Sequence, residues 1–551
     1  MKAADMSVLT VAGQLVDALV ARGVDTVFVM PGDQLSPLFD AMHAQRHRIR
    51  VVVVRHEQTA AYMAYGAARA TGAMGVCIVP PGPGALNALA GLSIALAAGT
   101  PVLCITGQIP LAMIGKRLGH LHELPDQLLT LRSVTKWAGR IACADDATAT
   151  FNAALAAMYA GAPGPVALEV PPDVLRAPAA LGGSASADAD PPNALPDAHA
   201  LDRAAAWLAR ARRPLVVAGG GAIGARAALG RLAERLQAPV VSNGGGRGVL
   251  DARHPLAMSV PAGHRLWRDA DVVLGVGTRL GRPYCEWGAD DAMKVIRIDS
   301  DRTRLETSFA GLGIVADAQA AVDGLEQRLA DYRAPSRAAE LAAVRAAVER
   351  EFAAIDPQAS FVAALRGALP DDGVLVDELT QIGYACRIGY PVYAPRTYIT
   401  SSYQGALGYG FATALGVKAA QRQRAVVSIN GDGGFLYTAN DLATAVQYRL
   451  GVIAVVFNDN AYGNVLREQA AHGYQLATSL HNPDFGAHAR AFGAFAQRVD
   501  SAAALADAIR DALDRELPTV IEVPVGAMTD PWPLLRLPRV RGGGNPPKEA
   551  R

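Results

Sequence analysis

The sequence predicts an α/β protein built from three doubly wound domains whose sheets are mainly parallel. Short runs of Val, Ile and Leu recur along the chain and end in glycine, proline or charged residues, and segments of helical periodicity separate them. Strands that alternate with helices in this way form parallel sheets, which bind ligands at the carboxyl ends of their strands. The length of 551 residues is enough for about three domains of roughly 150–200 residues each.

The composition is that of a globular protein, with 51% hydrophobic and 19% charged residues. A net charge of +1 without a basic cluster gives no electrostatic reason to expect binding to nucleic acid or to a membrane surface. Five scattered cysteines without CxxC spacing predict reduced core thiols in a cytoplasmic protein. The N-terminal segment has the spacing of an amphipathic helix and not of a signal peptide, and no stretch has the length and hydropathy of a membrane span.

The N-terminal domain is predicted over residues 1–176. Four apolar runs in it are followed by glycine, proline or charged residues: 27–30, 51–54, 76–79 and 102–106. Because the carboxyl ends of parallel strands meet at one edge of a sheet, the segments after these runs should form one working edge.

The remaining boundaries follow from composition. Residues 177–198 are rich in Pro and small residues and are predicted to be a linker. A central domain is expected over 199–335 and a C-terminal domain over 336–538. The tail, 539–551, is expected to be disordered.

The residues with the clearest chemistry lie between Gly431 and Gly463. An apolar run at 425–429 ends in a glycine-rich turn that contains Asp432, and a second run at 452–457 ends in Asn458-Asp459. Both runs have the pattern of buried parallel strands with a helical segment between them, so their oxygen-rich ends should lie side by side.

These residue types suit a clamp for a metal ion and a diphosphate. Glycine lets the backbone approach a phosphate closely with its N–H groups directed at it. Asp432 and Asp459 are hard oxygen ligands, and Mg²⁺ takes one or two carboxylates together with phosphate oxygens. A βαβ unit with ordinary turns also contains glycines, but the Asn-Asp pair that follows after twenty-four residues (434–457) favours the clamp.

This stretch resembles the diphosphate-binding signature of thiamine-diphosphate enzymes, in which GDG is followed, after a spacer of similar length, by Asn-Asn or Asn-Asp. Residues 55–72, RHEQTAAYMAYGAARATG, resemble the family segment RHE-x-x-A-A-x-M-A-x-G-x-A-R-x-T-G. Nearly the whole chain resembles the acetolactate-synthase-like group of 2-oxo acid decarboxylases and carboligases. Its domains would then be pyrimidine-binding, central and diphosphate-binding.

The resemblance implies thiamine diphosphate and Mg²⁺ as cofactors. Mg²⁺ would be held by Asp432, the Asp459 side chain and the Ala461 carbonyl. Glu57 would bond N1′ of the aminopyrimidine and promote the imino form that removes the C2 proton. On residue type alone, Glu57 could instead be a favourable charge at a helix start.

Further cofactor contacts are implied along the chain. Leu407, within a segment that resembles GTMGFG, would bend the cofactor, although a Leu among glycines is also ordinary packing. The other contacts implied are Gly32, Thr380, Gln381, Gly431, Gly433, Gly434, Asn458 and Tyr462.

Three residues are candidates for contact with the substrate. Gln108 stands where the family has a glutamine that lines the pocket. His122 stands near the place of a histidine pair in pyruvate decarboxylases, and it is either a proton relay or an ordinary loop histidine. Asp33 replaces a second glycine of the acetolactate synthases and either reaches the substrate or serves as a turn residue.

The central domain leaves the presence of FAD open. Its segments 219–221 and 277–279 resemble those that hold FAD in acetolactate synthases. Residues 256–267 do not reproduce the flavin-facing sequence of the family, and many relatives keep the domain without a nucleotide.

The expected activity is decarboxylation of a 2-oxo acid followed by ligation to a second carbonyl compound. The alternatives are a non-ligating decarboxylase of the benzoylformate or indolepyruvate type and a catalytically silent homologue. A homodimer or homotetramer with its active sites between subunits is expected. Acetolactate synthases carry Met and Trp at the positions of Asn464 and Glu468, so either the pocket is more polar here or these two residues face solvent.

Overall fold

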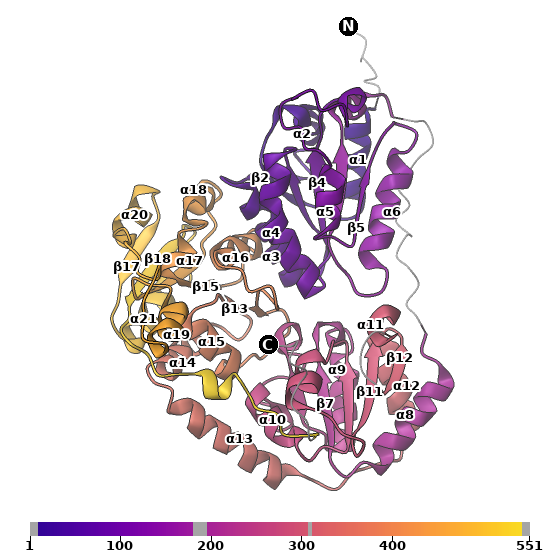
Figure 1. Ribbon diagram of the computed structural model, residues 1–551, viewed down its shortest axis with the longest axis vertical. Coiled ribbons are helices and arrows are strands. Elements are labelled where there is room, and N and C mark those ends of the chain that lie inside the picture. The colour runs from indigo at the N-terminus through magenta and orange to yellow at the C-terminus, as the bar shows by residue number, and fades with distance from the viewer. Residues whose placement is uncertain (1–8, 180–194, 307–310, 543–551) are drawn as a thin grey trace.

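The computed structural model describes residues 9–179, 195–306 and 311–542 (Figure 1). Each of the three domains is built on a parallel sheet of six strands with helices packed against it. In Figure 1 the N-terminal domain lies at the top, the central domain at the lower right and the C-terminal domain at the left. The predicted α/β class with three mainly parallel sheets is confirmed.

The N-terminal sheet has the strand order β2-β1-β3-β4-β6-β5. Its strands are β1 (Thr26–Val29), β2 (Arg50–Val53), β3 (Gly75–Val79), β4 (Val102–Gly107), β5 (Trp137–Arg140) and β6 (Val166–Val170). Its helices are α1 (Val11–Ala21), α2 (Ser36–Ala44), α3 (Glu57–Thr71), α4 (Pro83–Ala98), α5 (Gln127–Arg132), α6 (Ala147–Tyr159) and α7 (Pro172–Arg176). The four predicted strands are β1 to β4, and β5 and β6 complete the sheet.

The central sheet has the order β12-β11-β10-β7-β8-β9. Its strands are β7 (Pro214–Ala218), β8 (Val240–Ser242), β9 (Ala257–Met258), β10 (Val272–Val276), β11 (Lys294–Asp299) and β12 (Leu312–Val315). The helices are α8 (Ala198–Arg210), α9 (Arg226–Leu236), α10 (Val260–Trp267), α11 (Arg302–Glu306) and α12 (Ala318–Arg328).

The C-terminal sheet has the order β14-β13-β15-β16-β18-β17. Its strands are β13 (Val374–Val376), β14 (Tyr398–Ile399), β15 (Val426–Gly431), β16 (Ile453–Asn458), β17 (Phe495–Arg498) and β18 (Thr519–Pro524). The helices are α14 (Gln358–Ala368), α15 (Gln381–Gly389), α16 (Tyr409–Ala420), α17 (Asp432–Phe435), α18 (Leu442–Gln447), α19 (Gly463–Ala471), α20 (Phe485–Ala491) and α21 (Ala502–Ala512), and helix α13 (Ala338–Ala353) lies between this domain and the central one.

The helical segment predicted between β15 and β16 is divided into α17, a 3-10 turn η6 (Ala439–Asp441) and α18. The division occurs near Thr438, whose Oγ1 donates a hydrogen bond to the Gly408 carbonyl at 3.0 Å. The chain after the glycine-rich turn is therefore fixed to the start of α16 before it continues into α18.

Domain boundaries differ from the prediction in two places. Helix α13, assigned to the C-terminal domain, buries Leu341 and Val348 in the hydrophobic core of the central domain. The tail is not disordered from residue 539, because the Val540 N–H donates to the Trp287 carbonyl at 2.9 Å and Arg541 pairs with Asp290 at 3.0 Å. Most of the predicted linker and the rest of the tail lie outside the described residues.

The cysteines are only partly in the core. Cys77, Cys104 and Cys386 are buried, whereas Cys143 and Cys285 are exposed. The expectation of core thiols is wrong for these two, because Cys143 follows β5 on the surface and Cys285 is an exposed residue of the short π-helix Pro283–Trp287.

Helices α3 and α16 join the N-terminal and C-terminal domains through glycine, and they lie side by side in Figure 1. A Cβ atom on Gly66 would lie 2.1 Å from the Thr413 carbonyl oxygen, and one on Gly416 would lie 2.0 Å from the Met63 carbonyl oxygen. Both positions therefore require glycine, because the opposing atoms belong to the backbone and cannot move away alone.

The substitution Gly66→Ala should lower the free energy of unfolding by about 1–3 kcal/mol, because the added methyl group overpacks the contact between α3 and α16. The matched control is Gly367→Ala in α14, where a Cβ atom meets nothing within 4 Å. The control should leave stability unchanged or raise it by about 0.4–1 kcal/mol. Thermal unfolding of both variants is the measurement, and equal melting temperatures would contradict the argument.

Candidate active site

Two carboxylates converge at the ends of neighbouring strands in the C-terminal sheet. Strands β15 and β16 pair in parallel with Gly431 opposite Phe457, so Asp432 and Asp459 follow adjacent strand ends. Asp432 is buried, and burial followed by the charge of Asp432 raises the pKa of Asp459 to about 6. A buried carboxylate and a half-buried one that repel each other make a fitting site for a cation such as Mg²⁺.

The described residues contain no cluster of three or more His, Cys, Asp or Glu side chains arranged for a metal ion. A cation at Asp432 and Asp459 would therefore need other oxygen ligands, which suits a shared site with a phosphate. Ala461, the predicted carbonyl ligand, is nearly buried, and its N–H donates to Asp459 Oδ1 at 3.2 Å. Its role toward a metal stays a prediction.

Asn482 is a member of this site that the sequence pattern does not reveal. Its Nδ2 donates to Asp432 Oδ2 at 2.7 Å, to Asn460 Oδ1 at 3.1 Å and to Asn458 Oδ1 at 3.2 Å. It therefore orients the first carboxylate against the second strand end. No spacing rule connects it with the clamp, because it lies beyond α19 in the sequence.

The glycines of the turn are required by close approach of protein atoms. A Cβ atom on Gly433 would lie 2.8 Å from the Tyr462 ring, and one on Gly434 would lie 2.1 Å from Glu378 Oε1. A Cβ atom on Gly431 would lie 3.2 Å from the Thr380 side chain. The structure thus brings these predicted cofactor-binding residues together.

Thr380 and Gln381 begin helix α15 at the same sheet edge. The Thr380 hydroxyl caps the helix by accepting the Gly383 N–H at 2.9 Å. Gln381 Nε2 donates to Asn464 Oδ1 on α19. Leu407 is half-buried and lies just before α16, between Gly405 and Gly408, which both have positive φ.

Glu378 is a second residue that sequence reasoning missed. It is 1% exposed, and its Oε1 accepts the Gly408 N–H at 2.5 Å beside the Gly434 backbone. Burial raises the pKa of Glu378 to about 8, with the nearby Asp377 charge adding to the increase. Its position after β13 marks the strand end, but its burial is visible only in the fold.

Glu57 occupies the working edge of the N-terminal sheet. It is the first residue of α3, as predicted, and it is half-buried. Asn87 on α4 donates its Nδ2 to Glu57 Oε2 at 2.9 Å. A Cβ atom on Gly84 would lie 3.2 Å from Glu57 Oε1, so the first turn of α4 comes close to the second carboxyl oxygen as well.

The loops of the N-terminal domain gather around this edge. A Cβ atom on Gly32 would lie 2.8 Å from the Pro80 side chain, and one on Gly82 would lie 2.6 Å from the His122 carbonyl oxygen. His122 has a φ of 72°, and its Nδ1 is buried without a hydrogen-bond partner among the described residues. Gln108 is buried, and its Oε1 accepts the Ile109 N–H at 2.7 Å. Asp33 is exposed, beside a hollow of about 410 Å³ that Gly32 also lines.

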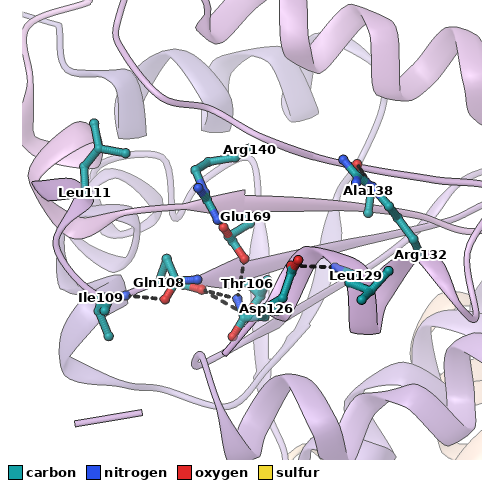
Figure 2. Close-up of polar contacts among 12 residues, drawn as sticks. Thr106, Gln108, Ile109, Leu111, Asp126, Leu129, Arg132, Ala138, Arg140 and Glu169 are labelled. Atoms are coloured by element: carbon teal, nitrogen blue, oxygen red, sulfur yellow. Dashed lines mark hydrogen bonds and ion pairs between the residues drawn. The ribbon is translucent and has the colours of Figure 1, made fainter. Parts of the chain in front are cut away.

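A buried polar group beneath these loops was not predicted either. Glu169 on β6 pairs with Arg140 on β5, and Figure 2 shows this ion pair beside Gln108. Gln127 donates to Glu169 Oε2 at 2.9 Å and to the Gly107 carbonyl at 3.0 Å, and its own Oε1 accepts the Gly82 N–H at 2.8 Å. This group fixes the end of β4 and the loop before α4, which carry Gln108 and lead to Asn87.

Comparison with known proteins agrees with this geometry. Residues 9–130 match the family described as thiamine pyrophosphate enzyme, N-terminal TPP binding domain. Residues 201–325 match the central domain of the same enzymes, and residues 380–523 match their C-terminal TPP binding domain.

Curated relatives extend over most of the chain. A probable 2-ketoarginine decarboxylase of Pseudomonas aeruginosa is 33% identical over 497 residues, which is 88% of each chain. A probable acetolactate synthase large subunit of Methanocaldococcus jannaschii is 30% identical over 97% of this chain and 94% of its own length. The acetolactate synthase isozyme 3 large subunit of Escherichia coli is 29% identical over 98% of both chains.

The chain belongs to the thiamine pyrophosphate enzymes. Within them it is acetolactate synthase-like, as the sequence motifs predicted. The conclusion rests on all three domains and not on the glycine-rich turn alone.

The two halves of the candidate site in this thiamine pyrophosphate enzyme, Glu57 on one side and Asp432 with Asp459 on the other, lie on different domains of the chain. Among the described residues, no hydrogen bond connects the Glu57 carboxyl group with Asp432 or Asp459. Large apolar side chains near both halves are exposed in the single chain, namely Leu86 at 41%, Tyr437 at 53% and Leu476 at 71%.

The positions that differ from acetolactate synthases have separate environments. Asn464 is half-buried and hydrogen-bonded to Gln381, one of the residues predicted to bind the cofactor. Glu468 is exposed in the chain, as in the alternative in which it faces solvent, and a pocket role for Asn464 stays a prediction.

The central domain of this family member uses its glycines for packing. The Gly221 N–H donates to the Gly277 carbonyl at 3.2 Å, and a Cβ atom on Gly277 would lie 2.4 Å from the Gly221 backbone. The close approach of these two loops is by itself a sufficient reason for glycine at both positions, so the glycines do not indicate a flavin site. In the part of the chain that is described, no helix combines the length and hydropathy needed to cross a membrane.

Removal of the Asp432 carboxylate should abolish high-affinity binding of thiamine diphosphate, because Asp459 alone leaves the metal with too few protein oxygens. The variant is Asp432→Ala, and the control is Asp507→Ala, an exposed carboxylate on α21. The measurement is a titration with thiamine diphosphate at fixed Mg²⁺ and again after chelation. Equal affinity of the Asp432 variant and the wild type would contradict the clamp.

The stability of the cofactor-free protein should fall as the pH rises from about 5 to about 8 and then level off. Because burial raises the pKa of Glu378 from 4.5 to about 8, the folded state holds a proton in this range that the unfolded chain releases. Glu378→Gln should lose this part of the pH dependence, and Glu516→Gln, on the surface, should keep it. Melting curves across the range test this, and parallel curves for wild type and the Glu378 variant would contradict it.

Proposed function

We propose that the chain is a thiamine-diphosphate- and Mg²⁺-dependent enzyme that decarboxylates a 2-oxo acid and ligates the remaining acyl unit to a second carbonyl compound. The proposal rests on the presence of two sets of groups in one chain. Glu57, hydrogen-bonded to Asn87, lies at the edge of one sheet, and Asp432 and Asp459 lie at the edge of another. A catalytically silent homologue would not need both sets of groups. Acetolactate synthases among the relatives support the ligation step.

The residues present fit thiamine diphosphate and Mg²⁺. Thiamine diphosphate, when bound, supplies a carbon nucleophile and an electron sink for decarboxylation. Asp432 and Asp459 would hold Mg²⁺, with the Ala461 carbonyl as a third ligand. The N–H groups of the glycine-rich turn would bind the diphosphate, and Asn458 and Tyr462 would complete its surroundings.

Glu57 would hold and release a proton at the aminopyrimidine. Asn87 binds one of its oxygens, which orients the other for that proton. Leu407 would press the cofactor into its bent shape, and Gly32 would let the loop before α2 approach the pyrimidine. Gln108 lies in the same group of loops, where it can reach a bound substrate.

The donor is proposed to be a 2-oxo acid with a polar side chain. Asn464 replaces an apolar residue of acetolactate synthases and is joined to Gln381. The Pseudomonas aeruginosa relative, whose name specifies a 2-ketoarginine substrate, supports a donor of this kind. A purely aliphatic substrate would displace water from the Asn464 amide without offering it a hydrogen bond in return. The unsatisfied amide would cost about 1–3 kcal/mol.

A second candidate is decarboxylation that ends in protonation and release of an aldehyde. It is favoured by His122, whose buried Nδ1 has no partner among the described residues and can serve a ligand. A decarboxylase is also named among the relatives. The two candidates share every step up to loss of CO₂.

The active unit is proposed to be a homodimer or homotetramer in which a second copy completes each site. Exposed Leu86, Tyr437 and Leu476 near the two half-sites support this assembly. A location in the cytoplasm stays a prediction, and FAD is not part of the proposal.

Replacement of Glu57 by Gln should retain folding and cofactor affinity but lower kcat by roughly two to four orders of magnitude, because amide cannot exchange the proton. Glu516→Gln is the matched control on the surface. Turnover of 2-oxo acids and hydrogen–deuterium exchange at C2 of bound thiamine diphosphate are the measurements. An unchanged exchange rate in the Glu57 variant would overturn the proposed function.

Product analysis by mass spectrometry should show weak self-condensation of pyruvate and faster turnover of 2-oxo acids with polar or larger side chains. The variant Asn464→Met should shift kcat/KM toward pyruvate by about tenfold, since it restores an apolar wall. Glu468→Gln, at an exposed position, should leave the ranking unchanged. If pyruvate self-condensation is the fastest reaction and the Asn464 variant does not alter the ranking, the polar pocket is wrong.

A further inference from the structure

The turn that carries Glu57 is held by the C-terminal domain of the same chain. Strand β2 is an edge strand, so one side of it has no neighbouring strand. Side chains from α18 and its end occupy that side: the Val53 N–H donates to the Tyr448 hydroxyl at 3.0 Å, and the Val53 carbonyl oxygen lies 3.2 Å from Thr444 Oγ1, whose single proton it shares with Asp441. These bonds satisfy backbone groups that an edge strand would otherwise leave unpaired.

Asp441 makes the central contact of this arrangement. It is completely buried, and its Oδ1 accepts the Arg55 N–H at 2.8 Å and the Thr444 hydroxyl at 2.7 Å. Its Oδ2 accepts the Thr59 hydroxyl at 2.6 Å. Arg55 and Thr59 lie two residues before and two residues after Glu57, so one carboxylate fixes the chain on both sides of the acid.

The segment that supplies Asp441 is the one that begins with the glycine-rich turn. Asp441 ends η6, and Thr438 in the same segment is bonded to the Gly408 carbonyl. The carboxylate is therefore not free to follow a movement of the Glu57 turn. A group held this rigidly can define where the Glu57 side chain starts.

We propose that Asp441 is a positioning residue for the reaction, which sets the place of the Glu57 carboxyl group without touching cofactor or substrate. The proposal rests on the proposed function, because it assigns Asp441 a role only if Glu57 exchanges the proton. Proton transfer is sensitive to displacement, and a shift of about 1 Å can cost up to about a hundredfold in rate.

The test compares Asp441→Ala with Asp441→Asn. The alanine variant removes every acceptor, whereas asparagine keeps an oxygen for the Arg55 N–H, and the Thr59 hydroxyl can turn to accept from the amide. We expect the alanine variant to lower kcat and the rate of C2 hydrogen–deuterium exchange in bound thiamine diphosphate by about tenfold or more. Thiamine diphosphate affinity and KM should stay within about twofold, and the asparagine variant should recover most of both rates.

Asp299→Ala in the central domain is the matched control. Asp299 is also buried, and its Oδ1 accepts the Asp301 N–H at 3.0 Å, but it lies away from the Glu57 turn. The control should lose stability while it keeps the exchange rate. An unchanged exchange rate in a folded Asp441→Ala variant would overturn the proposal.

If Asp441→Ala does not fold, Thr59→Val replaces it, since this substitution removes the Oδ2 contact alone. A smaller decrease in exchange rate at unchanged cofactor affinity is then expected, and a wild-type rate would overturn the proposal. The Glu57→Gln variant separates the two hypotheses. If the Glu57→Gln variant shows the wild-type rate of C2 hydrogen–deuterium exchange, the proposed function fails. If the Asp441 and Thr59 variants show the wild-type rate and the Glu57→Gln variant does not, only the positioning role fails.

Discussion

The structure depends on the contact between α3 and α16, in which glycine allows the backbones of two helices to touch. Helix α3 begins with Glu57, and α16 begins just after Leu407. Because Gly66 and Gly416 leave no room for a side chain between the helices, this contact fixes the N-terminal domain against the C-terminal domain. At the glycines the backbone of one helix packs directly against the backbone of the other. This close packing gains more dispersion attraction than a looser interface would.

Several polar groups are buried beneath the loops near the candidate sites, and they have specific partners. Asp441 accepts two hydrogen bonds from the N-terminal domain and one from Thr444 in its own domain, and Gln127 connects Glu169 with two loops. Such groups are costly to bury unless their hydrogen bonds are made, so they hold one arrangement of the loops in preference to others. Glu378 differs from these groups, because burial raises its pKa to about 8 and so favours the neutral carboxyl group beside the glycine-rich turn.

The site is therefore divided in a way that suits its chemistry. Glu57, the acid proposed to exchange a proton, lies at the edge of one sheet, and the carboxylates suited to a cation lie at the edge of another. This separation makes each chain depend on a second copy in the proposed assembly.

The sequence by itself determined the fold class, the four strand ends of the N-terminal sheet and the positions of Glu57, Asp432 and Asp459. These features are readable because strand runs, glycine turns and acidic strand ends are local patterns with fixed spacing. Only the tertiary structure revealed Asn482, Glu378, Gln127 and Asp441. Their roles depend on burial and on partners far away in the sequence, such as Arg55 for Asp441, and no local pattern encodes such a partner. The same reason explains why α13 was assigned to the wrong core: its apolar residues show that it packs, but the surface it packs against is decided by the fold.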